Sequence, residues 1–89
     1  MRLNRLSELA NNDNEIGNIV RFGNEYLIEI KKWNGEIVKL KTENCRSITH
    51  NVEVSDEIGD IVCDKGICKF MTADNADVIL SVDADELKA

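Results

Sequence analysis

Apolar residues recur with two different periods along this chain, and the first is helical. Leu3, Leu6 and Leu9 lie three residues apart, which predicts a short amphipathic helix over about residues 3–11. The run of asparagine and aspartate at 11–14 is typical of a loop, because such side chains bond locally to the backbone. A helix of about three turns is not stable alone. We therefore expect its leucines to pack on a core.

From about residue 18 onward the period is two, which predicts strands with one buried and one exposed face. The Asn-Gly pair at 34–35 usually signals a two-residue turn, but that register would place Ile30 beside Lys39 on one face. A three-residue turn with Gly35 in the left-handed conformation pairs Ile30 with Val38 instead. We therefore predict this bulged turn.

The same period predicts a meander over the rest of the chain. A tight turn at Lys65-Gly66 would make Cys63 face Cys68 across a second hairpin. The prediction is one α+β domain over residues 1–89, in which the helix precedes six or seven antiparallel strands that form a curled sheet or a small open barrel. The predicted strands cover about residues 18–22, 25–32, 36–42, 46–54, 58–63, 67–72 and 77–82, and a tail follows over 83–89.

Composition excludes several classes of protein. A chain of 89 residues has room for one domain, and 43% hydrophobic residues are too many for disorder throughout. A net charge of −6 opposes phosphate backbones and anionic lipid, so we expect no direct binding of nucleic acid or membrane. Apolar runs are far too short to span a bilayer, and none follows Arg2 and Arg5 as in a secretory signal. We expect a cytoplasmic protein.

The cysteines leave a metal site open as an alternative. Three cysteines, an odd number, favour reduced thiols over a disulfide framework. Cys63 and Cys68 could share a metal ion, form a disulfide when oxidised, or serve as small core hydrophobes. Cys45 and His50 would complete a zinc set, but their separation puts them on opposite faces of an unbroken strand, unless the chain turns near Asn44. We expect core thiols and no cofactor.

Residues typical of catalysis are scarce. His50 is the only histidine and lies on the apolar side of its predicted strand with Ile48 and Val52, where a packed side chain is commoner than a general base. The carboxylates fall on exposed faces and turns rather than as an unlike pair in a cleft. The glycines are scattered singly, so no phosphate-binding loop is present. We expect no catalytic residues and no enzyme.

The acidic charge belongs to the second part of the chain. Residues 1–41 carry a net charge of +1 and residues 42–89 a net charge of −7. This pattern fits a solvated surface, or a face that binds a basic surface of a protein partner. If the partner binds nucleic acid, the carboxylates could occupy the cleft meant for phosphates. The candidate partner-binding residues are Asp56, Glu57, Asp60, Asp64 and Trp33.

Two further features concern interfaces. Trp33 lies at the tip of the first predicted hairpin, where it is either an interface anchor or a ring folded over Lys31 or Ile37. Some apolar residues fall on faces predicted to be exposed, so that either the helix or another subunit, as in a homodimer, should cover them. They are Val20, Leu27, Ile37 and Ile79.

In size, acidity and lack of catalytic motifs, and on composition alone, the chain resembles small accessory proteins of phages and other mobile elements. We expect a small acidic, non-enzymatic interaction protein, an inhibitor or regulator that binds a basic surface of a macromolecular partner. The alternatives are a small metal-binding module that uses Cys63 and Cys68, and a homo-oligomeric ligand-binding protein.

Overall fold

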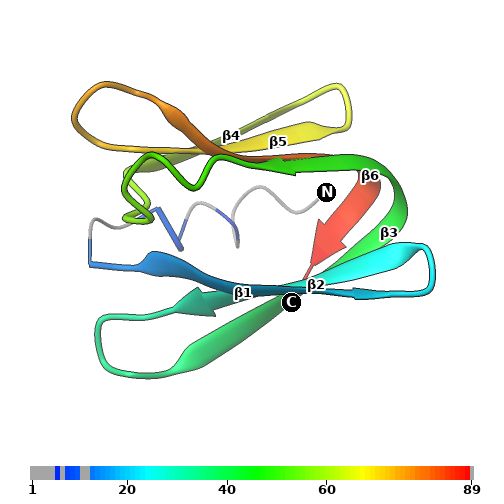
Figure 1. Ribbon diagram of the computed structural model, residues 1–89, viewed down its shortest axis with the longest axis horizontal. Coiled ribbons are helices and arrows are strands. Elements are labelled where there is room, and N and C mark those ends of the chain that lie inside the picture. The colour runs from blue at the N-terminus through cyan, green and yellow to red at the C-terminus, as the bar shows by residue number, and fades with distance from the viewer. Residues whose placement is uncertain (1–5, 7, 11–12, 89) are drawn as a thin grey trace.

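The computed structural model describes residues 6, 8–10 and 13–88, which form one antiparallel sheet of six strands. The strand order in the sheet is β1-β2-β3-β6-β5-β4 (Figure 1). The strands are β1 (Glu15–Phe22), β2 (Glu25–Lys31), β3 (Ile37–His50), β4 (Asp60–Asp64), β5 (Ile67–Met71) and β6 (Val78–Lys88). The described residues are therefore all-β, and the predicted α+β class is wrong.

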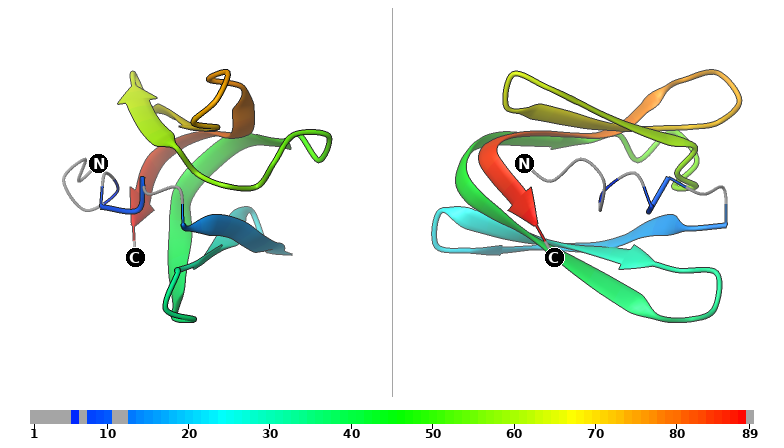
Figure 2. Two further views of the ribbon diagram at one scale, coloured as in Figure 1. Left: turned by 90° about the vertical axis from the view of Figure 1, so that its left-hand side faces the viewer. Right: turned by 180° about the vertical axis from the view of Figure 1, so that it is seen from behind.

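The N-terminal helix is the main correction. Residues 3–5, 7 and 11 of the predicted helix lie outside the described part of the chain; of the others, only Leu6 is helical, and the described elements include no helix. The N–H of Leu9 donates to the carbonyl of Leu6 at 3.0 Å, which closes a single turn. Both leucines are buried in the core, and Figure 2 shows this segment between the two halves of the sheet. Leucines three residues apart share a face in one turn as well as in a helix, so the period identified the core contacts but not the element.

Two long strands fold the sheet over on itself. β3 and β6 run from one half to the other, so that β1 and β2 face β4 and β5 (Figures 1 and 2). The predicted strand 36–42 and residues 46–50 of the predicted strand 46–54 form one strand, which bends at Asn44 without ending, whereas residues 51–54 belong to the connection that follows it. Asn44 has a φ of 53°, which asparagine tolerates better than most residues, and a bulge follows between Cys45 and Ser47. The predicted tail over 83–89 is instead, as far as Lys88, the second half of β6, because Leu87 pairs with Thr42 and is buried.

Both predicted hairpin turns are present. Gly35 has a φ of +88°, and Ile30 pairs with Val38 as the bulged turn requires. Lys65 and Gly66 both have positive φ, as in the primed two-residue turns that suit a hairpin. The predicted registers of both hairpins are therefore confirmed.

The core lies between the two halves of the folded sheet. Ile79, predicted to be on an exposed face, is fully buried like its neighbour Leu80. Strict alternation does not allow two adjacent buried residues, but the register of β5 against β6 shifts between Phe70 and Met71 beside them. The largest fully buried side chains include Phe70, Ile28, Ile30, Leu40, Ile58, Ile79, Leu80 and Leu87.

The two sides of the open sheet are joined at one end. The N–H of Ile16 donates to the carbonyl of Asp56 at 3.0 Å, and the N–H of Ile58 donates to the carbonyl of Asn14 at 2.9 Å. These bonds link the start of β1 to the segment before β4. The sheet is thus curled, and among the described residues these backbone contacts close it at this end.

Candidate functional site

Three connections between strands gather at the same end of the sheet. They span residues 32–36, 51–59 and 72–77 and lie on the left in Figure 1. Together with residues 13–15 and 60 they contain nine acidic residues and one basic residue, Lys32. The acidic residues are Asp13, Glu15, Glu36, Glu53, Asp56, Glu57, Asp60, Asp74 and Asp77. We call these residues, together with Trp33 and Val52, the acidic end.

Hydrogen bonds through Asn14 and Gly59 link the segments that carry the three connections. The side-chain Oδ1 of Asn14 accepts the N–H of Trp33 at 3.2 Å, while its backbone carbonyl accepts the N–H of Ile58. On the other side, the N–H of Gly59 donates to the carbonyl of Met71 at 2.7 Å. The acidic end is therefore built on a connected scaffold rather than on three independent loops.

Two large apolar side chains are exposed among the carboxylates. Trp33 is 68% exposed and Val52 is 78% exposed. The alternative in which the indole ring folds back over its strand would leave much less of it accessible. Tryptophan is enriched among the residues that dominate binding energy at protein interfaces, so the acidic end carries an apolar anchor at the same end of the sheet as its nine acidic residues.

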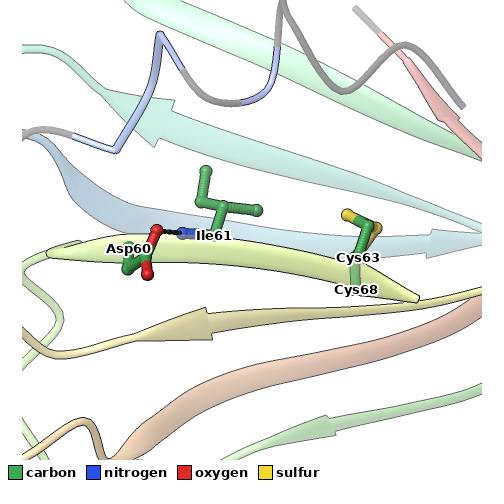
Figure 3. Close-up of a disulfide and its surroundings, with 4 residues drawn as sticks. All are labelled: Asp60, Ile61, Cys63 and Cys68. Atoms are coloured by element: carbon green, nitrogen blue, oxygen red, sulfur yellow. Dashed lines mark hydrogen bonds between the residues drawn. A yellow bond between two sulfur atoms is a disulfide. The ribbon is translucent and has the colours of Figure 1, made fainter.

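The structure separates one of the predicted site residues from the others. Asp56, Glu57 and Asp60 lie at the acidic end, and Asp60 accepts the N–H of Ile61 at 2.8 Å (Figure 3). Asp64 is the last residue of β4, beside the turn at the opposite end. Four residues of extended chain place it about 13 Å from Asp60.

His50 belongs to this region through Asp56. Its Nε2 lies 3.4 Å from Oδ1 of Asp56, and both side chains are partly accessible to solvent. This contact joins the end of β3 to the following connection. Nothing in its geometry distinguishes the pair from an ordinary surface contact between histidine and carboxylate.

Cys63 and Cys68 form a disulfide across the β4–β5 hairpin (Figure 3). The predicted pairing of the two residues is confirmed, but the expected reduced thiols are not what the structure shows. While the bond is present, neither sulfur is the thiolate that binds metal. Among the described residues, no group of three or more His, Cys, Asp or Glu side chains could hold a metal ion.

Cys45 is the free cysteine, and its position disfavours a reactive thiol. Burial raises the pKa of the Cys45 thiol, and the nearby Glu25 carboxylate raises it further. The thiol contacts the carbonyl of Ser47 at 3.5 Å. A thiol with a raised pKa carries little thiolate at neutral pH, and the thiolate is the nucleophile.

A second candidate region is an open cleft of about 480 Å³ at the bend of β3. The Glu25 carboxylate there accepts the hydroxyl of Thr42 at 2.7 Å and the N–H groups of Asn44 and Cys45 at 2.9 and 3.2 Å. The bond from Thr42 is the main cause that lowers the pKa of Glu25. The cleft is lined by Arg21, Asn24, Glu25, Tyr26, Asn44, Cys45, Arg46 and Ser47.

Arg46, also in this cleft, is paired with two carboxylates of β6. Its Nε lies 2.8 Å from Asp83 and its Nη1 lies 2.6 Å from Asp85. Hydrogen bonds to Asp85 and Asp83 raise the pKa of Arg46, and the bond from Arg46 lowers the pKa of Asp85. The charged groups of Glu25 and Arg46 already bond to other residues of this chain and stabilise the bend of β3. The cleft is therefore a weaker candidate for a binding site than the acidic end.

Seven residues of the acidic end were not predicted as site residues, namely Asp13, Glu15, Glu36, Val52, Glu53, Asp74 and Asp77. The turns after the second, fourth and sixth predicted strands are the three connections of the acidic end. They lie at one end because β3 bends back on itself and because Asn14 and Gly59 hold neighbouring segments together, and neither feature is visible in the local sequence.

The chain has no significant match to a protein-family model, to a curated protein or to a solved structure. Within its described part, no helix is both long and apolar enough to cross a membrane.

Proposed function

We propose that this chain is a non-enzymatic interaction protein, an inhibitor or regulator whose acidic end binds a basic surface of a protein partner. The observation that supports this most is the exposure of Trp33 and Val52 among the carboxylates of three linked connections. Apolar anchors surrounded by charge are typical of protein interfaces, in which a few buried residues dominate affinity. The surrounding negative charge would speed association with a basic surface and disfavour acidic ones.

The structure sharpens which carboxylates belong to this proposal. Asp56, Glu57 and Asp60 lie at the acidic end with Trp33, whereas Asp64 lies at the other end of β4. Asp64 carries the same charge on the same strand as Asp60, and both residues are exposed. It therefore provides a matched control for charge reversal.

Site-specific photocrosslinking in native cells tests the proposal. A photoreactive amino acid at position 52 should capture a protein with a basic surface, and Glu57→Lys in the same chain should reduce the yield about tenfold or more. A chain with the reactive group at position 62, on the outer face of β4, should not capture that protein. Equal capture from both positions, or a yield that Glu57→Lys leaves unchanged, would contradict the proposed site.

The only tryptophan of the chain is a direct reporter of binding, because Trp33 is at the proposed interface. Titration with the purified partner, or with a peptide of alternating lysine and leucine as a probe, should change its fluorescence. Asp60→Lys should weaken the response, whereas Asp64→Lys should leave it close to that of the wild type. Equal losses in the two variants would show that only the net charge matters and that the acidic end is not a specific site.

A cytoplasmic location is part of the proposal, and the disulfide makes it testable. Cytosolic thiols are kept reduced, so Cys63 and Cys68 should be found there as free thiols. Native cells can be quenched in acid and alkylated, and mass spectrometry of the 60–71 segment then shows the state of the two sulfurs. If the disulfide of the structure is also the dominant form in cells, an oxidising compartment replaces the cytoplasm in this proposal.

A further inference from the structure

The outer face of β1, β2 and the first half of β3 exposes large apolar side chains. Val20 is 49% exposed, Phe22 43% and Ile37 48%, while Leu27 is half-buried. The opposite face of the same three strands is buried in the core, with Ile28, Ile30 and Leu40 among its residues. We call the exposed side the outer face of the first hairpin. It is a second apolar surface on a small sheet.

Strand pairing makes part of this surface continuous. Val20 lies directly opposite Leu27, and Leu27 lies opposite Lys41. The ammonium group of Lys41 lies over the ring of Phe22, 5.3 Å from its centre. Val20, Leu27, Phe22 and the stem of Lys41 thus form one patch. Ile37 is four residues along β3 from Lys41, about 13 Å away.

The described N-terminal residues do not cover this face. The sequence left two candidates for covering it, the N-terminal segment and another subunit. Leu6 and Leu9 are buried in the same core cluster as Ile28, on the inner side of the sheet. Val20, Phe22 and Ile37 are exposed on the other side of the sheet, which leaves another subunit as the candidate to cover them.

The charges on this face favour a second copy of the chain. A twofold interface brings each patch against itself, so the patch needs both signs of charge. The exposed lysines at 31, 39 and 41 alternate with glutamates at 15, 29 and 43. By contrast, Asp60 and Asp64 flank Val62 on the outer face of β4, and Lys69, opposite Val62 on β5, balances only one of these charges, so two such faces would bring net negative charge together.

We propose that two copies of this chain pair through the outer face of the first hairpin around a twofold axis. The two sheets would pack face to face, as in a β-sandwich, with Val20, Phe22 and Leu27 interdigitating and the lysines of one copy near the glutamates of the other. The proposal does not depend on the function of the acidic end. A dimer would carry two acidic ends, so that a partner with two basic sites would be held by both.

Sedimentation equilibrium across a wide range of protein concentrations tests the pairing. The wild type should pass from monomer to dimer, and Val20→Lys should raise the dissociation constant about tenfold or more, since a charge enters the apolar contact. Ile37→Lys is a second variant with the same expected direction. Val62→Lys is the matched control, because Val62 is 46% exposed on the other half of the sheet, and its dissociation constant should stay at the wild-type value.

Each result either supports or overturns the proposal. Circular dichroism first confirms that each variant is folded, which is expected because all three positions are exposed. A wild type that is monomeric at every concentration would overturn the proposal, as would a dimer weakened by Val62→Lys but not by Val20→Lys. Glu57→Lys at the acidic end should dimerise like the wild type, so failure of the proposed function and failure of the dimer are distinguishable.

Discussion

The Glu25 carboxylate forms three hydrogen bonds, all to residues at the bend of β3. They come from the hydroxyl of Thr42 and from the N–H groups of Asn44 and Cys45. In Glu25→Gln one oxygen becomes an NH₂ group, which would face an N–H donor instead of accepting from it. We expect this variant to unfold at a lower denaturant concentration than the wild type at neutral pH, as measured by circular dichroism.

The pH dependence of this difference follows from the lowered pKa of Glu25. A carboxyl group whose pKa is lower in the folded state stabilises the protein above its unfolded pKa of about 4.3. That stabilisation is lost as the pH falls through the lower folded pKa. The deficit of Glu25→Gln relative to the wild type should therefore shrink in acid. Glu53→Gln, a change of the same kind at an exposed position in a connection, should show no such deficit at neutral pH.

Gly59 is required because another part of the backbone occupies the space of a side chain. A Cβ at this position would lie 2.4 Å from both the nitrogen and the Cα of Ala73, and backbone atoms cannot move aside as a flexible side chain can. Gly59→Ala should destabilise the protein by about 3 kcal/mol in chemical denaturation. At Gly23 nothing lies within 4 Å and only the positive φ is unfavourable, so Gly23→Ala should cost about 1–2 kcal/mol. An equal loss in both would show that Ala73 does not restrict position 59.

At the scale of elements, the disulfide stabilises the β4–β5 hairpin by closing a short loop. Cys63 and Cys68 are five positions apart, and a loop of this size predicts a contribution of about 2 kcal/mol. A reducing phosphine should lower the denaturation midpoint of the wild type accordingly. It should have no effect on the double variant Cys63→Ala/Cys68→Ala. An unchanged wild-type midpoint on full reduction would mean that strand pairing alone holds the hairpin.

The strand registers of the two hairpins could be predicted from local sequence, because a short turn allows few registers. Gly35 and the facing pair Cys63 and Cys68 were predictable from the requirement that apolar residues share a face. The bend at Asn44 was not, because a break in alternation also marks the end of a strand. The bend of β3 depends on Glu25 and Arg46, whose contacts cross from one element to another. Such partners are invisible to a local pattern.

In the candidate site, too, some features could be predicted from local sequence and others depend on the fold. Trp33 was predictable as an exposed tip, and Asp56, Glu57 and Asp60 as a local run of acid. Asp64 was grouped with them because it is close in sequence, but β4 carries it to the other end of the molecule. Residues that are close in sequence can therefore lie at opposite ends of the molecule when an extended strand joins them.

At the scale of the whole molecule, nine carboxylates at one end should repel one another. The molecule measures 31 × 27 × 25 Å, whereas the screening length is about 10 Å in 0.1 M salt, so this repulsion acts mainly within the acidic end. Added salt should raise the denaturation midpoint, since screening relieves repulsion in the folded state. The same salt should weaken binding of a basic partner, since it screens the attraction.

Neutralising variants assign this salt response to the acidic end. Asp74→Asn/Asp77→Asn removes two of its charges and should reduce the gain in stability between low and moderate salt, measured by chemical denaturation. Asp64→Asn, at the other end of β4, should leave the gain close to that of the wild type. Asp64→Asn could instead reduce the gain as much, per charge removed, as Asp74→Asn/Asp77→Asn does. The salt response would then depend on the total net charge of −6, and the clustering of carboxylates at one end would have no separate effect on stability.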